Sequence, residues 1–250
     1  MAARLMTLCC SPQALLAQER YDEAEGLLNR ALTTCEAVGG LAHEDTVAAA
    51  ANLVDCLDLQ GDRAAQEVLL SSLAYRRERE LGASHALVAD ALQQLGWCQH
   101  AQFKYAEAEA NLSKALRMQE EELGREHPST GETLWRCGWV LVAQRELGSA
   151  LTYLTRGLAI RDKALADTDD AELAESHLQL GQLLHGQLGQ AAPAEPHLRR
   201  AAAVYSQLTA SGEILLFFTV AVHRALQIFA AKPPSEKVSG AHPKTKLHWN

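Results

Sequence analysis

Three histidines with equal spacing are the first candidates for chemistry in this sequence. His43, His85 and His127 stand 42 residues apart, and an imidazole can bind a metal ion or move a proton. If each belongs to one repeat of a stacked structure, neighbouring imidazoles lie about 8–10 Å apart or more, whereas zinc requires its ligands at about 2 Å. The spacing therefore favours histidines in equivalent turns near helix N-termini, and we expect no metal and no other cofactor.

Cysteine is the second residue type that could do chemistry here. The sequence contains six: Cys9, Cys10, Cys35, Cys56, Cys98 and Cys137. They form no C-x-x-C pair, and Cys98 and His100 do not face each other on a helix, so no base converges on a nucleophile. A glycine-rich phosphate loop and an H-E-x-x-H motif are also missing. We predict reduced thiols that pack as small hydrophobic groups, with a disulfide framework as the alternative, and a protein that is not an enzyme.

Composition and charge argue against several classes of partner. The net charge of −8 gives a body that repels phosphate backbones, so we expect no nucleic acid. The longest apolar stretch, Ile214 to Val222, is far shorter than the roughly 20 residues that span a bilayer. Met1 to Cys10 lacks the features of a signal peptide, and only 5% of the residues are aromatic, which favours helices over sheets. We expect a cytoplasmic, helical protein that is not integral to a membrane.

An internal repeat positions these residues. The pairs Leu81-Gly82 and Leu123-Gly124 recur after 42 residues, and the segment Tyr21 to Glu25 returns as Tyr105 to Glu109 after two such periods. Self-similarity at a fixed period is the signature of a repeat architecture. The period predicts a repeat array over residues 1–210 with units at 1–42, 43–84, 85–126, 127–168 and 169–210.

Each period reads as two amphipathic helices joined by a short polar turn, which makes the two helices antiparallel. The first helices are expected at Thr46–Gln60, Leu87–Gln102, Thr130–Gln144 and Glu172–Gln187. The second helices are expected at Arg63–Leu81, Tyr105–Leu123, Leu147–Leu165 and Pro193–Leu208, with Arg20–Ala37 as the second helix of the first unit. The predicted fold class is therefore all-α, an α-solenoid of antiparallel helix pairs.

Small residues at three places in each unit carry a family resemblance. Gly96, Ala108 and Ala115 are spaced by 12 and 7 residues, a spacing repeated by the small residues at 138, 150 and 157. This pattern resembles the tetratricopeptide signature. The 42-residue period, the Leu-Gly before a His-Pro turn and the Tyr-x-Glu-Ala-Glu motif are similar to kinesin light chain repeats and their nephrocystin-like relatives, over roughly Pro12 to Leu208. The resemblance implies a tetratricopeptide superhelix of about four to five repeats that acts as a protein-interaction scaffold, and it alone suggests a link to a motor or the cytoskeleton.

The second unit departs from the signature. Val54, Gln66 and Leu73 stand where the other units have small residues. Larger side chains at a helix crossing hold the two helices apart, so we expect looser packing or a shifted crossing in this unit.

The first helices of stacked pairs line the concave side of a superhelix. By resemblance to kinesin light chains, one aligned row would hold the backbone of an extended peptide through polar side chains: Asn52, Gln94, Arg136 and Gln179. One turn away on one flank lie Asp55, Trp97 and Trp139, and on the other flank lie Asp90 and Glu132. The tryptophans are either core residues between units or anchors for a bound peptide.

Charge distinguishes this groove from those that it resembles. Kinesin light chain grooves are basic and take acidic, tryptophan-containing motifs, as the resemblance implies. Here Arg136 is the only Lys or Arg within the predicted first helices, among several acids. We therefore expect a protein or peptide partner with a basic segment, unless the acids simply form a solvated face. The alternative function is a structural, self-associating segment of a larger assembly.

The two ends carry separate predictions. Met1–Glu19 is expected to supply one more first helix, and residues 211–231 a C-terminal capping helix that covers the last exposed core. Self-association or a membrane-surface role is the alternative for that helix. Residues 232–250 turn polar and proline-containing, which predicts a disordered tail.

Overall fold

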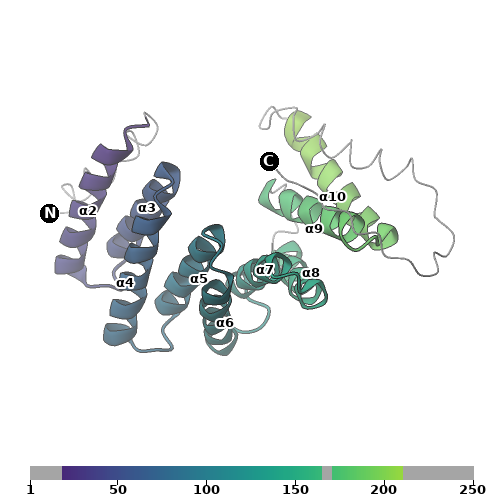
Figure 1. The fold of residues 1–250 in the computed structure, drawn as a ribbon. Coiled ribbons are helices and arrows are strands. Elements are labelled where there is room, and N and C mark those ends of the chain that lie inside the picture. The colour runs from purple at the N-terminus through teal and green to yellow at the C-terminus, as the bar shows by residue number, and fades with distance from the viewer. Residues whose placement is uncertain (1–18, 165–170, 211–250) are drawn as a thin grey trace. The chain divides into compact units, whose positions relative to one another are not determined.

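The computed structural model describes residues 19–164 and 171–210, and this part of the chain folds into α-helices joined by turns (Figure 1). The helices are α2 (Tyr21–Gly39), α3 (Glu44–Gln60), α4 (Arg63–Leu81), α5 (Ala86–Ala101), α6 (Tyr105–Glu122), α7 (Pro128–Ala143), α8 (Leu147–Ala164), α9 (Ala171–Gly186) and α10 (Ala191–Ala210). They fall into two compact units, Met1–Ala164 with α2 to α8 and Leu165–Asn250 with α9 and α10. The all-α repeat solenoid predicted from the sequence is confirmed.

In the first unit each helix packs against the next one along the chain, from α2 to α8. The first helices α5 and α7 of two neighbouring repeats also contact each other. The bounds agree closely with the predicted ones: α4 begins at Arg63 and ends at Leu81, as the sequence indicated. Helix pairs are thus stacked layer on layer within this unit.

The turn before the second helix of each repeat contains one residue with left-handed backbone. Glu19 (φ 57°), Gly61 (φ 76°), Phe103 (φ 64°) and Arg145 (φ 70°) follow one another at the 42-residue period. Glycine adopts this conformation without penalty, whereas an L-residue with a side chain pays about 1–2 kcal/mol. The repeat therefore imposes the same turn geometry whether or not glycine is present.

The turn between one pair and the next explains the two recurring landmarks of the sequence. Gly40, Gly82 and Gly124 have positive φ angles of 79°, 95° and 94° and end or follow the second helix of their pair. His43, His85 and His127 are the N-caps of α3, α5 and α7: each Nδ1 accepts a hydrogen bond of 3.1–3.2 Å from the backbone N–H two residues later. The equally spaced histidines hold helix N-termini in place, as expected for turn residues.

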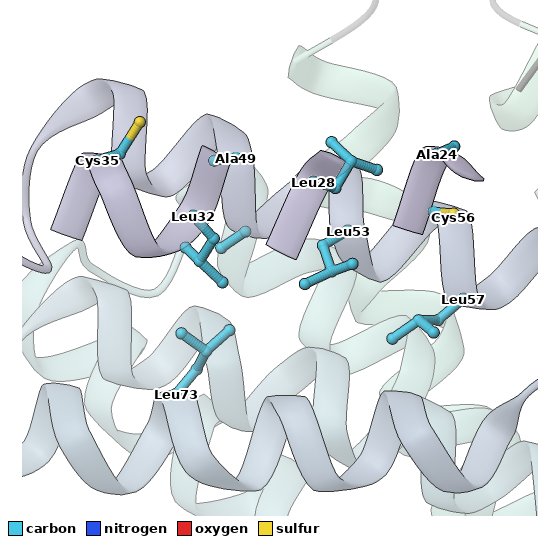
Figure 2. Close-up of a cluster of buried hydrophobic side chains, with 10 residues drawn as sticks. Ala24, Leu28, Leu32, Cys35, Ala49, Leu53, Cys56, Leu57 and Leu73 are labelled. Atoms are coloured by element: carbon cyan, nitrogen blue, oxygen red, sulfur yellow. The ribbon is translucent and has the colours of Figure 1, made fainter. Parts of the chain in front are cut away.

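The core crosses from one repeat into the next. Figure 2 shows buried side chains of α2, α3 and α4 that gather in one cluster, among them Leu28, Leu53 and Leu73. Cys35 and Cys56 are buried in the same cluster. Since one helix pair cannot bury its apolar faces alone, each layer depends on its neighbours for burial.

Glycines at the helix crossings allow close approach. A Cβ on Gly138 would lie 2.5 Å from Cγ of Leu154 in α8, and one on Gly96 would lie 2.7 Å from Cγ of Leu112 in α6. The second repeat, residues 43–84, has no such glycine. Its helices α3 and α4 are in much looser contact than the helices of the other pairs. Gln66 fills that crossing and donates a 3.3 Å hydrogen bond to the carbonyl of Val54. The expected looser packing is confirmed.

Side-chain hydrogen bonds and ion pairs link successive helix pairs, and they recur every 42 residues. A glutamine at the end of each first helix donates to a glutamate of the preceding second helix: Gln60 to Glu25 (3.3 Å), Gln102 to Glu67 (2.9 Å) and Gln144 to Glu109 (2.8 Å). Ion pairs join the second helices to each other: Glu36–Arg76 (2.7 Å), Glu78–Lys114 (3.0 Å) and Glu120–Arg156 (2.7 Å). Each pair is worth little alone, but the series fixes the register of the stack.

In the second compact unit, Leu165–Asn250, helices α9 and α10 form a pair with its own core. Leu178 of α9 packs with Leu198 and Ala201 of α10, and Gly181 sits where a Cβ would meet Leu198 at 2.7 Å. The signature of small residues thus serves the same close crossing here.

Several sequence predictions fall outside the described residues: the helix over Met1–Glu19, the capping helix at 211–231 and the tail at 232–250. Within the described ranges, no helix is both long enough and apolar enough to cross a bilayer.

Candidate peptide-binding site

A pocket of about 390 Å³ opens across the first helices of three successive repeats, α3, α5 and α7, and the start of α4; we call it the groove pocket. It is lined by six of the predicted site residues: Asp55, Asp90, Gln94, Trp97, Glu132 and Arg136. Its other lining residues are Ala51, Val54, Asp58, Arg63, Gln66, Gln93 and Cys98. The structure therefore brings together most of the predicted groove.

The repeat explains why these residues meet. Asp90 of α5 and Glu132 of α7 are one period apart, as are Gln94 and Arg136. Equivalent positions of stacked helices lie side by side, so each pair faces the same cavity. Within α5, Gln94 follows Asp90 by one turn and its Nε2 donates to both carboxylate oxygens at 3.1–3.2 Å.

The charge of the pocket is negative. Four carboxylates line it, from Asp55, Asp58, Asp90 and Glu132, against the two guanidinium groups of Arg63 and Arg136, a balance of 2 − 4 = −2. Asp58 is paired with Arg63, and Glu132 with Arg136 at 2.5 Å. Among the described residues, Asp55 has no ion-pair partner and is exposed. The pocket consequently attracts cations, and Asp55 is the carboxylate most available to one.

A buried arginine beneath the pocket was not predicted from the sequence. Arg77 of α4 is only 3% exposed, and its Nη1 lies 3.9 Å from Oδ2 of Asp90 and donates to the carbonyl of Leu87 at 3.1 Å. Burial lowers the pKa of this guanidinium, an effect that the carboxylate of Asp90 opposes. Arg77 thereby holds Asp90 at the wall of the pocket.

Trp97 forms one wall of the pocket and is 38% exposed. Its indole stacks on the imidazole of His100, with centroids 4.8 Å apart, and the guanidinium carbon of Arg136 lies 5.6 Å from the ring centroid. Burial lowers the pKa of His100, so its ring is neutral near pH 7. Trp97 is thus a groove residue with an aromatic face that already holds a cation.

The aromatic side chains continue from Trp97 to the turn between α5 and α6. His100 lies 5.7 Å from Tyr105, and Tyr105 meets Phe103 edge-on at 6.2 Å. Phe103 is 77% exposed. This cluster was not predicted from the sequence, although its four aromatic residues lie close together in the chain.

Three predicted site residues lie elsewhere. Asn52 is half-buried on α3 but is not part of the pocket lining. Trp139 is half-buried and packs edge-on against Trp135, one turn earlier on α7, with centroids 5.9 Å apart. Gln179 belongs to the second compact unit, where its Nε2 donates to Glu175 at 2.9 Å.

The chemistry available to the described cysteines and histidines is limited. Burial raises the pKa of the Cys56 and Cys98 thiols, and that of Cys137 to about 12, so these thiols are protonated at neutral pH. Over residues 19–164 and 171–210, no three metal-ligating side chains come together. What the groove pocket offers is a negative, partly aromatic surface for binding.

The sequence matches models of a known family with this fold. Models of the tetratricopeptide repeat match residues 100–163 and 13–45. Among curated proteins, no sequence is similar enough to this chain to count as a match.

Solved structures share the architecture at low sequence identity. BtubC (BKLC) from P. vanneervenii has a TM-score of 0.69 at 16% identity, over 98% of this chain and 88% of that one. The nearly identical TPR-like repeats assigned to a kinesin light chain of Podosopora anserina have a TM-score of 0.61 at 19% identity, over 83% of this chain and 97% of that one. A Rap protein complexed with Competence and Sporulation Factor has a TM-score of 0.55 at 15% identity, over 91% and 64%. These likenesses show a common fold.

Proposed function

We propose that the groove pocket of this chain, whose tetratricopeptide repeat fold is of the kinesin light chain type, binds a basic peptide segment of a partner protein. The observation that carries the proposal is the charge of the pocket lining, whose carboxylates outnumber its guanidinium groups four to two; with the buried Arg77 beside Asp90 counted as well, a net negative charge remains. Electrostatic complementarity selects partners by sign, so a Lys- or Arg-containing segment is favoured and an acidic one is repelled.

Polar groups in the pocket suit an extended backbone. The carboxamide of Gln94 is half-buried and held by Asp90, which leaves its carbonyl oxygen to accept from a peptide N–H. Trp97 supplies an aromatic surface of the kind that anchors bound side chains. That a Rap protein of the same fold is complexed with Competence and Sporulation Factor supports the use of such an array to hold a second molecule.

The compartment that we propose is the cytoplasm. Cys56, Cys98 and Cys137 are free thiols, each buried. Proteins of oxidising compartments commonly convert their cysteines to disulfides, whereas free buried thiols are typical of reducing ones. The partner is accordingly proposed to be a cytoplasmic protein.

Charge reversal at Asp55 tests the proposal. Labelled arginine-rich and glutamate-rich peptides of equal length are titrated with the protein, and binding is followed by fluorescence anisotropy. The arginine-rich peptide is expected to bind, and Asp55→Lys to weaken it by about tenfold through lost complementarity. Glu121→Lys makes the same charge change at an exposed residue of α6 outside the pocket and is the matched control. Equal weakening by both variants, or preference for the glutamate-rich peptide, refutes the proposal.

A further inference from the structure

We propose that the corner of the groove pocket formed by Trp97 and Glu132 is a subsite for one arginine or lysine side chain of the partner, and that Arg136 occupies it in the unbound protein as a built-in competitor. This inference rests on the proposed function and names how the same site recognises its ligand. It assigns Arg136 a role opposite to that of a ligand contact: the side chain must leave before the partner's cation enters.

The contacts of Arg136 are those that an incoming arginine would make. Its guanidinium carbon lies 5.6 Å from the centroid of Trp97, and its Nη2 lies 2.5 Å from Oε1 of Glu132. An indole face and a carboxylate together form a binding site for a guanidinium group, since the ring attracts the cation and the carboxylate accepts its N–H groups. Because Trp97 belongs to α5 and Glu132 to α7, the subsite spans two successive first helices.

The repeat shows that the fold does not need a cation at this position. The residues one and two periods before Arg136 are Gln94 and Asn52, both neutral, and α5 and α3 form with them in place. Arg136 is therefore not required for helix stacking. Its substitution by glutamine reproduces what the preceding repeat already contains.

Arg136 is held weakly enough to be displaced. Its partner Glu132 is one turn away on the same helix and 47% exposed, while the Arg136 side chain itself is 22% exposed. An ion pair between residues one helical turn apart contributes little when its carboxylate is exposed, so the half-buried guanidinium can leave it at small cost. The pocket of about 390 Å³ also leaves room for the displaced side chain beside the incoming one.

Arg63 provides a matched control for charge. It lines the same pocket and is paired with a pocket carboxylate, Asp58, whereas the guanidinium that lies over the Trp97 ring is that of Arg136. Arg63→Gln and Arg136→Gln remove one positive charge each from the same cavity. A difference between the two variants therefore reports occupation of the subsite, because the change in net charge is the same.

The test measures the affinity of a labelled arginine-rich peptide for the wild type, Arg63→Gln, Arg136→Gln, Trp97→Leu and the double variant Trp97→Leu/Arg136→Gln, with helicity checked by circular dichroism. Arg136→Gln is expected to bind about five- to tenfold more tightly than the wild type, since it removes a competitor held by a cation–π contact and one ion pair. Arg63→Gln is expected to gain about twofold or less through screened charge. The gain from Arg136→Gln should shrink in the Trp97→Leu background.

Each outcome is decisive. Weaker binding by Arg136→Gln means that Arg136 contacts the partner, which overturns the inference while the proposed function stands. Equal gains from Arg136→Gln and Arg63→Gln mean that net charge alone acts, and this also overturns it. Binding by Arg136→Gln where the wild type shows none supports the competitor directly. If no variant binds the basic peptide, the proposed function fails, and the inference fails with it.

Discussion

The carboxamide of Gln102 in the turn after α5 donates a 2.9 Å hydrogen bond to the carboxylate of Glu67 in α4. The same carboxylate accepts from Lys104 at 2.6 Å and from Gln99 at 3.2 Å. Glu67 thus joins one repeat to the next through three donors. Its hydrogen bond from Lys104 is the largest cause that holds the pKa of this carboxyl below its ordinary value, against the opposing effect of burial.

Replacing Glu67 by glutamine should destabilise the protein more at neutral pH than in acid. A carboxyl with a lowered folded-state pKa contributes stability above its unfolded pKa and loses it as the pH falls through the folded pKa, which for Glu67 lies below its ordinary value. We expect Glu67→Gln to cost about 1 kcal/mol at pH 7, because its partners are partly exposed, and less at pH 3. Urea unfolding at both pH values, with Glu121→Gln as control, measures the difference. A loss that is equal at both pH values contradicts the assignment.

Gly157 of α8 should not tolerate even a methyl group. A Cβ there would stand 2.8 Å from the carbonyl oxygen of Gly131 and 2.9 Å from the backbone nitrogen of Trp135, and backbone atoms cannot move aside. We expect Gly157→Ala to cost about 1–3 kcal/mol. Gly26 of α2 is exposed with open space around it, so Gly26→Ala should stabilise by up to about 1 kcal/mol through helix propensity. Thermal melts of both variants test the pair; a stabilised Gly157→Ala protein would contradict the close crossing.

Removing the N-cap at His85 should destabilise the protein, and another N-cap residue should restore its stability. Its Nδ1 accepts from the N–H of Leu87 at 3.1 Å, so His85→Ala should cost about 1 kcal/mol. Aspartate is a strong N-cap residue and should restore the stability in His85→Asp. Chemical unfolding distinguishes the two variants. If alanine and aspartate are equally harmful, the imidazole acts through packing and not as a cap.

Phe103 is expected to store strain in the turn between α5 and α6. Its φ angle of 64° lies in the left-handed region that Gly61 (φ 76°) adopts at the same place in the preceding repeat, and its ring is 77% exposed. Phe103→Gly should stabilise the fold by about 1 kcal/mol, less whatever its contact with Tyr105 contributes. Gly61→Ala, which introduces the strain instead, should destabilise by about 1 kcal/mol. The midpoints of urea unfolding provide the comparison, and a destabilised Phe103→Gly protein would show that the ring is held by contacts.

The helices could be predicted closely because the repeat states the same signals several times. Leu-Gly ends a second helix and a histidine begins the next first helix at 42-residue intervals, so one ambiguous boundary is corrected by its equivalents. The looser second unit could also be predicted, since Gln66 and Leu73 replace small residues at the crossing. These features depend on local sequence and on size alone.

Side-chain partners could not be predicted from the period. Trp97 and Trp139 are equivalent in register, but the residue one turn earlier is Gln93 in the first case and Trp135 in the second, and Trp139 packs on that second indole. The burial of Arg77 could not be predicted because it depends on how α4 packs against α5. There Arg77 pairs with Asp90 and donates to the carbonyl of Leu87. A helical register tells which face a residue occupies and leaves its partner across the interface open.

The most direct test of the central claim is to observe the Trp97 indole while a basic peptide binds. Protein labelled with ¹⁵N at tryptophan is titrated with an arginine-rich peptide, and the indole signals are assigned with a Trp97→Phe variant. If the groove pocket is the binding site, the Trp97 signal shifts and saturates with the binding isotherm, while those of Trp135 and Trp139 change little, because Trp135 is buried and neither lines the pocket. Binding that leaves the Trp97 signal in place would contradict the account.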